Sequence, residues 1–270
     1  MRKFRLIIPV LNQFDSVDRY VSSFCNLAKR PIDILLIDNG SSEQLVRTDV
    51  VSKINQDGHN IFCLRLEKNV GVYPTFQIGA NTSEEWEYLF YSHSDVEMFE
   101  DEWDIKLEDI LTELENNANP GICGMFGARG IGTPNIYKAP YDFRQLMRWD
   151  TYTNEMMLHA GGKLIPGAYK RIMVLDGFSL ICSRDFIRVV GFNTDDYPVH
   201  HNYDNRICLQ SHFAGFENYV LNINCIHHGG VTSTREKWAE KMGRTDLEIH
   251  REAHRIMYEE FKGRLPAFVE

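Results

Sequence analysis

Short apolar runs alternate with amphipathic stretches along the first third of the chain. Residues 4–10, 32–37 and 88–92 are almost uniformly apolar and have the length of single strands. Residues 15–28 carry apolar side chains at helical spacing, and Pro31 ends this predicted helix. Because uniformly apolar strands joined by helices are typical of a sheet covered on both faces, the pattern predicts an α/β fold with a mixed, mostly parallel central sheet flanked by helices.

The remainder of the chain is patterned less regularly. Residues 102–117 alternate apolar with acidic side chains, which predicts an amphipathic helix. Residues 122–128, 172–182 and 217–226 are predicted strands. Residues 129–171 mix glycine, proline and aromatic residues with basic side chains and show little periodicity. A stretch of that length without a pattern is usually a functional loop or an insertion, so we expect a variable segment there.

The composition is that of an ordinary globular protein. Of the 270 residues, 43% are hydrophobic and 25% are charged, which fits one α/β domain with at most a modest appendage. No apolar run is long enough to span a membrane, and the N-terminus lacks the apolar core of a signal peptide, so we expect a soluble, cytoplasmic protein. The net charge of −9 disfavours nucleic acid, although the basic residues of 129–171 leave an anionic partner open.

Candidate metal ligands follow the apolar run at residues 88–92. The polarity changes abruptly at His93, Ser94 and Asp95, with Glu97 close behind. Ligands of open α/β sheets bind just beyond the carboxyl ends of the strands, and imidazole and carboxylate groups both ligate divalent cations. The alternative is a polar strand end in which Asp95 or Asp101 accepts backbone N–H bonds as the cap of the following helix.

Two turns at other predicted strand ends carry further candidates. Asp38 ends the second predicted strand and is followed by Asn39-Gly40, which forms a turn on any interpretation. An Asp in this position is also suited to holding a ribose or a base edge. Asn69 and Gly71 lead into a predicted helix whose N-terminus could present N–H groups to phosphate, or they form a plain loop.

The order of these pieces resembles the nucleotide-binding half of family-2 glycosyltransferases with the GT-A fold. The resemblance lies in the runs IIPVLN, ILLIDNGSS, KNVGV and YLFYSHSDVE. It implies a nucleotide-sugar donor, with a UDP-sugar favoured, whose base or ribose contacts Asp38 and whose nucleotide lies near Asn69 and Gly71. It also implies Mn²⁺ or Mg²⁺ at the family's Asp-x-Asp motif, where His93 replaces the first Asp and Asp95 keeps the second. A rival alignment on Asp95 would make Glu97 an added or alternative ligand.

The resemblance continues into the second half of the chain. Asp204 opens a predicted helix and falls on the catalytic Asp of the family's Glu-Asp motif, whereas Tyr203 replaces the Glu. The small-residue turn Asp176-Gly177 matches a turn that precedes the family's acceptor segment. The alternative for Asp204 is an ordinary helix cap.

A histidine pair completes the resemblance. His227 and His228 end the last predicted strand, where the family has a His that contacts metal or diphosphate. Neighbours on an extended segment point to opposite sides, and we favour His227 over His228. Candidate donor-binding residues and metal ligands, in chain order, are Pro9, Asp38, Asn69, Gly71, His93, Ser94, Asp95, Asp176, Gly177, His227 and His228.

These assignments imply transfer of a sugar from a nucleoside diphosphate to an acceptor hydroxyl. Asp204 as the general base gives inversion, whereas Asp176 or Asp196 acting as a nucleophile would give retention. The implied acceptor is a glycan, a lipid-linked glycan or a modified nucleic acid. One alternative is a sugar-phosphate nucleotidyltransferase, but such an enzyme would open with a Gly-rich phosphate loop that is missing here. Another is a non-catalytic nucleotide-sugar-binding module, because His93 and Tyr203 stand at acidic positions.

The expected domain organisation follows from the same resemblance. A charge-rich helix is predicted at residues 237–262, broken near Gly243, with His250 and His254 on a solvated face. The expected units are a GT-A domain (1–233), made of a nucleotide-binding half (1–97) and an acceptor half (98–233) with the variable segment 129–171, and a C-terminal helical extension (234–270).

Overall fold

The computed structural model describes most of the chain. The described residues are 4–42, 58–82, 85–132, 149–156, 161–192, 201–229, 238–241 and 243–270. The helices are α1 (Phe14–Leu27), α3 (Val72–Asn81), α4 (Trp103–Asn117), α5 (Arg184–Val189), α6 (Tyr203–Phe213), α8 (Trp238–Lys241) and α9 (Asp246–Glu260). The strands are β1 (Phe4–Val10), β2 (Asp33–Asp38), β3 (Asn60–Arg65), β4 (Tyr88–Ser92), β5 (Val96–Met98), β6 (Pro120–Gly124), β7 (Phe126–Ile131), β8 (Trp149–Thr153), β9 (Lys163–Leu164), β10 (Tyr169–Ile172), β11 (Val174–Leu175), β12 (Ser179–Ser183), β13 (Glu217–Leu221), β14 (Cys225–His227) and β15 (Ala267–Phe268).

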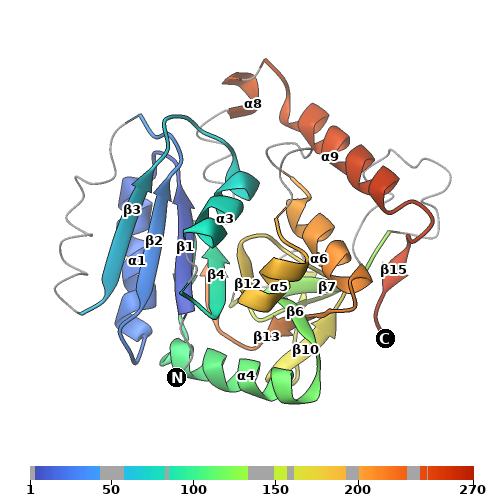
Figure 1. Cartoon of the computed structure of the whole chain (residues 1–270), viewed down its shortest axis with the longest axis horizontal. Coiled ribbons are helices and arrows are strands. Elements are labelled where there is room, and N and C mark those ends of the chain that lie inside the picture. The colour runs from blue at the N-terminus through green and yellow to red at the C-terminus, as the bar shows by residue number, and fades with distance from the viewer. Residues whose placement is uncertain are drawn as a thin grey trace.

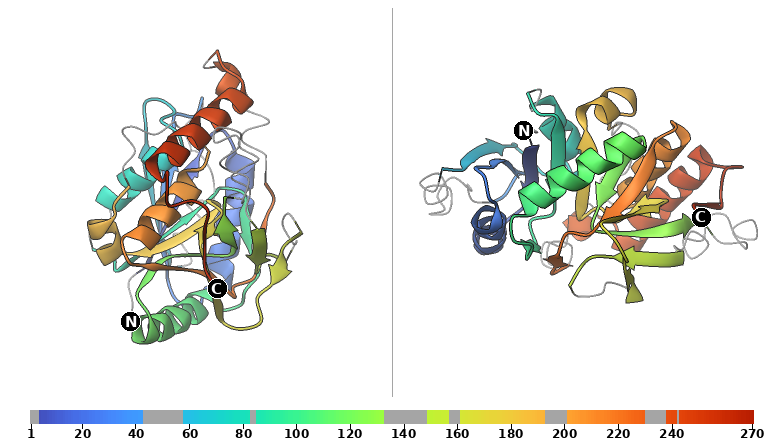
Figure 2. Two further views of the ribbon diagram at one scale, coloured as in Figure 1. Left: turned by 90° about the vertical axis from the view of Figure 1, so that its right-hand side faces the viewer. Right: turned by 90° about the horizontal axis from the view of Figure 1, so that it is seen from below.

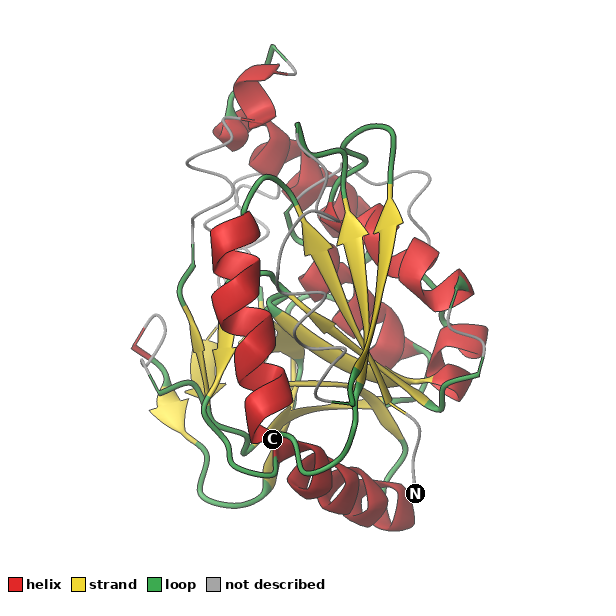
Figure 3. Ribbon diagram, turned by 90° about the vertical axis from the view of Figure 1, so that its left-hand side faces the viewer, coloured by secondary structure: helices red, strands yellow, loops and turns green. Residues whose placement is uncertain are grey.

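The central sheet has the order β10-β13-β6-β12-β4-β1-β2-β3 (Figure 1). Strands β3, β2, β1 and β4 are parallel, and β12 runs antiparallel between β4 and β6. Figure 3 shows the three strands β1 to β3 fanning out beside the upright helix α1. Because parallel strands end at the same edge, this half of the sheet brings its carboxyl-terminal loops together. The mixed, mostly parallel sheet confirms the predicted α/β fold.

Two apolar layers cover the sheet, and the alternation along β1 assigns side chains to them. Leu6 and Ile8 pack in the layer made by α1 and α4, whereas Ile7 packs in the layer that includes α3 and α6. The right-hand view of Figure 2 shows α4 crossing the sheet on the near side. All three side chains are buried, so β1 forms the centre of the core.

Three predicted strands of the second half are each divided in the structure. Residues 122–128 contain the end of β6 and the start of β7, which belong to different sheets. Gly124 ends β6 where a Cβ atom would lie 2.3 Å from the carbonyl oxygen of Ser179, so the backbone turns away at a point of close approach. Residues 172–182 contain β11 and β12, joined by the Asp176-Gly177 turn, and residues 217–226 contain β13 and most of β14.

A second sheet of order β11-β7-β8-β9 receives β15 alongside β7, so the C-terminal end of the chain joins the sheet (Figure 1). The predicted break near Gly243 is confirmed, because it separates α8 from α9. The prediction of a solvated histidine face on α9 is wrong: His254 is 5% exposed, and its ring stacks on His250, which stacks in turn on His201.

None of the helices in the described ranges combines the length and apolarity needed to span a bilayer. Asp196, the possible alternative nucleophile, lies outside the described part of the chain. In the variable segment 129–171, the structure describes β8, β9 and β10 but not residues 133–148 or 157–160.

Candidate active site

Three potential metal ligands meet beside the carboxyl end of β4. One ligand atom from each of His93, Asp95 and His227 lies within 4.8 Å of the other two. His93 and Asp95 follow β4, whereas His227 ends β14, which pairs with β5 so that His227 stands opposite Val96. The antiparallel β5–β14 ribbon therefore brings a residue from late in the chain against Asp95.

The cluster combines a buried carboxylate with two imidazoles. Asp95 is 5% exposed, and its Oδ1 lies 3.4 Å from Nε2 of His227. Burial would raise the pKa of Asp95, but the contact with His227 and the charges of His93 and His227 outweigh burial and lower this pKa. Burial would lower the pKa of His227, but Asp95 outweighs burial and raises it, whereas burial lowers the pKa of His93. Two imidazoles and a carboxylate form a donor set that suits divalent transition metals.

The imidazole of His227 is oriented by its surroundings. Its ring stacks on Phe178, with a centroid distance of 4.6 Å and an interplanar angle of 17°. Its backbone N–H donates to Oε1 of Glu155, at 2.8 Å, and Glu155 is 1% exposed. An isolated bridge between Glu155 and Cys225 holds that carboxylate next to β14. These contacts leave Nε2 of His227 facing Asp95.

His228 lies outside the cluster, as expected for the neighbour of His227 on an extended strand. Its Nε2 is 2.8 Å from Oε2 of Glu97, and its ring stacks on Tyr20 at 4.8 Å. Glu97 also pairs with Arg19, at 3.1 Å. Glu97 and His228 therefore form a separate surface pair, and neither belongs to the group around Asp95.

Tyr203, the first residue of α6, directly contacts the cluster of potential metal ligands His93, Asp95 and His227, which is called the metal corner below. Its hydroxyl is 3.0 Å from Nε2 of His93, and its ring stacks on Tyr73 and meets Phe76 edge-on. Burial raises the pKa of Tyr203 well above its usual value, so the hydroxyl keeps its proton. A Cβ atom on Gly177 would lie 2.3 Å from the same hydroxyl, so Tyr203 requires a glycine there.

Asp204 lies next to Tyr203 and is held by backbone groups. Its Oδ2 accepts from the N–H of Gly177, at 3.0 Å, and its Oδ1 accepts from the N–H of Asn205, at 2.7 Å. The residue as a whole is 9% exposed. The N-cap position belongs to Asn202, which makes no side-chain cap bond, so Asp204 takes over part of the capping.

Asp176 adds a second carboxylate to the same region. It is half-buried, and its Oδ1 accepts from the N–H of Phe178 at 3.3 Å. Its charge acts to raise the pKa of His93, His227 and Tyr203, which places it near all three. The Asp176-Gly177 turn thus connects Asp204 with the metal corner.

The nucleotide-side candidates form a neighbouring group. Asp38 is 2% exposed and pairs with Arg65 at 2.6 Å, while its Oδ1 accepts from the N–H of Ser41. Arg65 also donates to the carbonyl of Ser41. The Asp38 turn and the Asn69 turn are locked together, because Asn39 donates to Oδ1 of Asn69 and to the carbonyl of Gly71.

Hydrogen bonds link this group to the metal corner through the end of β1. The N–H of Asn12 donates to Oγ of Ser41, and the hydroxyl of Ser94 donates to Oε1 of Gln13 at 3.5 Å. Pro9 is buried within β1, opposite Ile37 of β2. The carboxyl ends of β1, β2 and β4 therefore present the predicted residues side by side.

Several residues of the site were missed by sequence reasoning. No local motif marks Arg65 as the partner of Asp38. Likewise, no local motif marks Phe178 and Glu155 as the residues that hold His227 in place. The first could have been found from strand register, since Arg65 stands opposite Asp38 on parallel β3. The other two, Phe178 and Glu155, reach His227 through tertiary contacts that no spacing in the sequence indicates.

The mixed sheet flanked by helices has the GT-A fold of the glycosyltransferases on which the chain superposes. The chain belongs to glycosyl transferase family 2, whose sequence profile matches residues 6–171. A search of curated protein sequences gave no significant match.

Two solved structures illustrate the shared fold. The structure of GalNAc-T7 with UDP, GalNAc and Mn²⁺ superposes with a TM-score of 0.61 at 14% identity, covering 84% of this chain and 43% of that one. The structure of S. aureus TarS residues 1–349 in complex with UDP-GlcNAc superposes with a TM-score of 0.52 at 12% identity, covering 97% of this chain and 72% of that one. The chain spans less than half of GalNAc-T7, and at such identities the likeness concerns the fold alone.

Proposed function

We propose that the protein transfers a sugar from a UDP-sugar to an acceptor hydroxyl with inversion at the anomeric carbon. In this proposal a divalent cation is held by His93, Asp95 and His227, and Asp204 is the general base. The observation that carries it is the ligand group at the carboxyl edge of the sheet, with ligand atoms within 4.8 Å, beside the Gly177–Asp204 contact. Family membership and the UDP-containing neighbours support the choice of donor.

The donor side of the reaction needs charge neutralisation. A bound Mn²⁺ or Mg²⁺ would neutralise the negative charge that develops on the departing diphosphate. The role of the chain is to hold that position: Asp95 supplies the carboxylate, and His227 is kept in place by Phe178 and by its backbone bond to Glu155. Asp38 and Asn69 would contact the nucleotide, with Arg65 keeping the Asp38 carboxylate in one orientation.

The acceptor side needs a base that is held in place. Backbone N–H groups of Gly177 and Asn205 donate to the two oxygens of Asp204, which fixes the orientation of the carboxylate. In this proposal the oriented carboxylate of Asp204 accepts the proton of the attacking hydroxyl. A single base acting on an attack opposite the leaving group produces inversion. An anionic acceptor is the proposed class, on the strength of the basic residues in 129–171.

The test is a screen of UDP-sugars for slow hydrolysis, which requires no knowledge of the acceptor. Each donor is incubated with and without Mn²⁺, and release of UDP is measured for wild type, Asp95→Asn and Asp204→Asn. We expect metal-dependent release by wild type, loss of that release in Asp95→Asn, and retained UDP binding in Asp204→Asn. Absence of UDP release and of UDP binding by the wild type, with every donor, would refute the proposal.

A non-catalytic binding module is the second candidate. Two observations favour it: His93 and Tyr203 stand at positions where the family has acids, and both carboxylate oxygens of Asp204 are already engaged by backbone groups. Calorimetric titration with UDP-sugars separates the two functions. Binding that is independent of metal, without hydrolysis or transfer, would identify the module.

A further inference from the structure

The two departures from the family's acidic motifs are partners in space. His93 replaces the first Asp of the metal motif, and Tyr203 replaces the Glu that precedes the candidate base. They are separated by 110 positions in the chain, yet the hydroxyl of Tyr203 lies 3.0 Å from Nε2 of His93. An Asp and a Glu at this separation would repel each other or share a proton, whereas an imidazole and a phenol form a neutral hydrogen bond.

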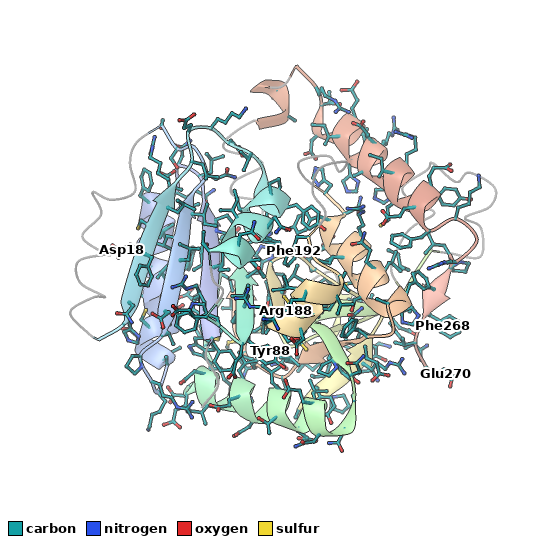
Figure 4. The ribbon with its side chains drawn as sticks, in the orientation of Figure 1. Asp18, Tyr88, Arg188, Phe192, Phe268 and Glu270 are labelled. Atoms are coloured by element: carbon teal, nitrogen blue, oxygen red, sulfur yellow. The ribbon has the colours of Figure 1, made fainter. Side chains whose placement is uncertain are left out.

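The geometry around Tyr203 holds its hydroxyl at one position. The ring is fixed on one side by stacking on Tyr73, with centroids 5.5 Å apart, and on another by the edge contact with Phe76. Tyr73 and Phe76 belong to an aromatic cluster with Phe192, which Figure 4 labels near the middle of the molecule. Gly177 admits the hydroxyl because a larger residue would collide with it. A ring confined in this way can act as a fixed hydrogen-bond partner.

We propose that Tyr203 is a positioning residue of the metal corner, whose hydroxyl accepts from Nε2–H of His93 and so leaves the Nδ1 lone pair to bind a cation. This inference rests on the proposed function, because it assigns a partner to a ligand of the same site. The hydrogen bond made by one ring nitrogen of a histidine determines which tautomer forms, and so which nitrogen can ligate a metal. The opposite arrangement, in which Tyr203 donates to Nε2, would place the proton on Nδ1 and block ligation.

The position of Tyr203 in the chain extends its effect to the acceptor side. It is the first residue of α6 and immediately precedes Asp204, whose carboxylate is held by Gly177. The Tyr203–His93 bond therefore ties the start of α6 to the metal corner. Displacement of the ring would disturb the ligand and the candidate base together.

The test removes a single oxygen atom and compares it with a matched control. Tyr203→Phe keeps the ring and loses the contact with His93, whereas Tyr73→Phe removes the hydroxyl of the neighbouring buried tyrosine, which interacts with Arg206 instead. Mn²⁺ affinity is measured by calorimetry without donor. Loss of a partner of a metal-binding histidine typically weakens metal binding 10- to 100-fold, and we expect about that loss in Tyr203→Phe and little change in Tyr73→Phe.

A second measurement needs neither metal nor turnover. Imidazole ¹⁵N shifts, assigned to His93 with His93→Gln, report the tautomer in the metal-free wild type, where we expect the Nε2–H form. An Nδ1–H form, or an Mn²⁺ affinity that Tyr203→Phe leaves unchanged, would overturn the inference while leaving the proposed function intact. Wild type that binds UDP but no Mn²⁺ would overturn both the inference and the metal dependence of the proposed function.

Discussion

Replacement of Gly177 by alanine tests how tightly the site is packed. A Cβ atom at this position would lie 2.3 Å from the hydroxyl oxygen of Tyr203, 2.7 Å from Cζ and 2.9 Å from Cε2. Ordinary van der Waals contact begins near 3.4 Å, so the hydroxyl must move by about 1 Å. The ring cannot yield freely, because Tyr73 and Phe76 pack against it. The backbone of Gly177 lies outside the positive-φ region, so the effect of Gly177→Ala is one of overpacking.

The expected magnitude follows from that overlap. Overpacking of a filled interior typically costs 1–3 kcal/mol, and we expect about 2 kcal/mol for Gly177→Ala. For a chain of this size the melting temperature would fall by roughly 4–8 °C. Mn²⁺ affinity should fall as well, because movement of Tyr203 breaks its contact with His93.

The assay is calorimetric unfolding of Gly177→Ala beside a matched glycine variant. Gly167→Ala is that control, since a Cβ atom there has no neighbour within 4 Å and the backbone φ of Gly167 is not positive. We expect Gly167→Ala to unfold at the wild-type temperature or slightly above it. A Gly177→Ala protein that melts within about 1 °C of wild type and binds Mn²⁺ equally well would refute the packing argument.

Three further predictions concern the base, the ligands and the C-terminal helix. Asp204→Asn should lower the transfer rate by at least about 100-fold, measured as product formation with a matched donor and acceptor, while UDP affinity stays near the wild-type value. Excess Mn²⁺, at about 100 times the dissociation constant, should stabilise wild type and His228→Ala by about 2.7 kcal/mol but should not stabilise His227→Ala, as measured by thermal unfolding with and without the metal. Mg²⁺ should bind more weakly than Mn²⁺, because Mg²⁺ prefers oxygen ligands. Burial, helped by the charge of His201, lowers the pKa of His250 in the folded protein. The unfolded chain therefore binds more protons, and the free energy of unfolding falls as the pH drops below about 6.5. His250→Gln should lose less of this free energy between pH 7 and pH 5, measured by unfolding at each pH, and the same pH dependence as wild type would contradict this assignment.

The nucleotide half of the fold could be predicted because its signals are local. Strands β1, β2 and β4 are continuous apolar runs, and the turns after them contain residues that end a strand on any interpretation. The strand boundaries in the second half of the chain could not be predicted from such local signals. The strand predicted at residues 122–128 changes sheet at Met125, where Gly124 closely approaches Ser179.

In the candidate site, too, residues with a local signal could be predicted from the sequence, whereas contacts between distant positions could not. Asp95 and Asp204 could be found from their place at strand and helix ends. The preference for His227 over His228 agrees with the structure, but the pairing of β14 with β5 that brings His227 to Asp95 could not be inferred from the sequence. The contact of Tyr203 with His93 joins positions in two halves of the chain, so no spacing rule could indicate it. The division at residue 233 stays a prediction, although β15 returns to β7.

The ribbon of β5 and β14 bears on how the protein responds to a cation. Asp95 and His227 are about half of the sequence apart, and the ribbon places their side chains in contact. A metal ion bound by both would act as a removable cross-link closing a very long loop, and long loops are where such closure restricts the unfolded chain most. Removal of such an ion by a chelator would release this restriction without breaking a covalent bond, so the free energy of unfolding would depend on metal.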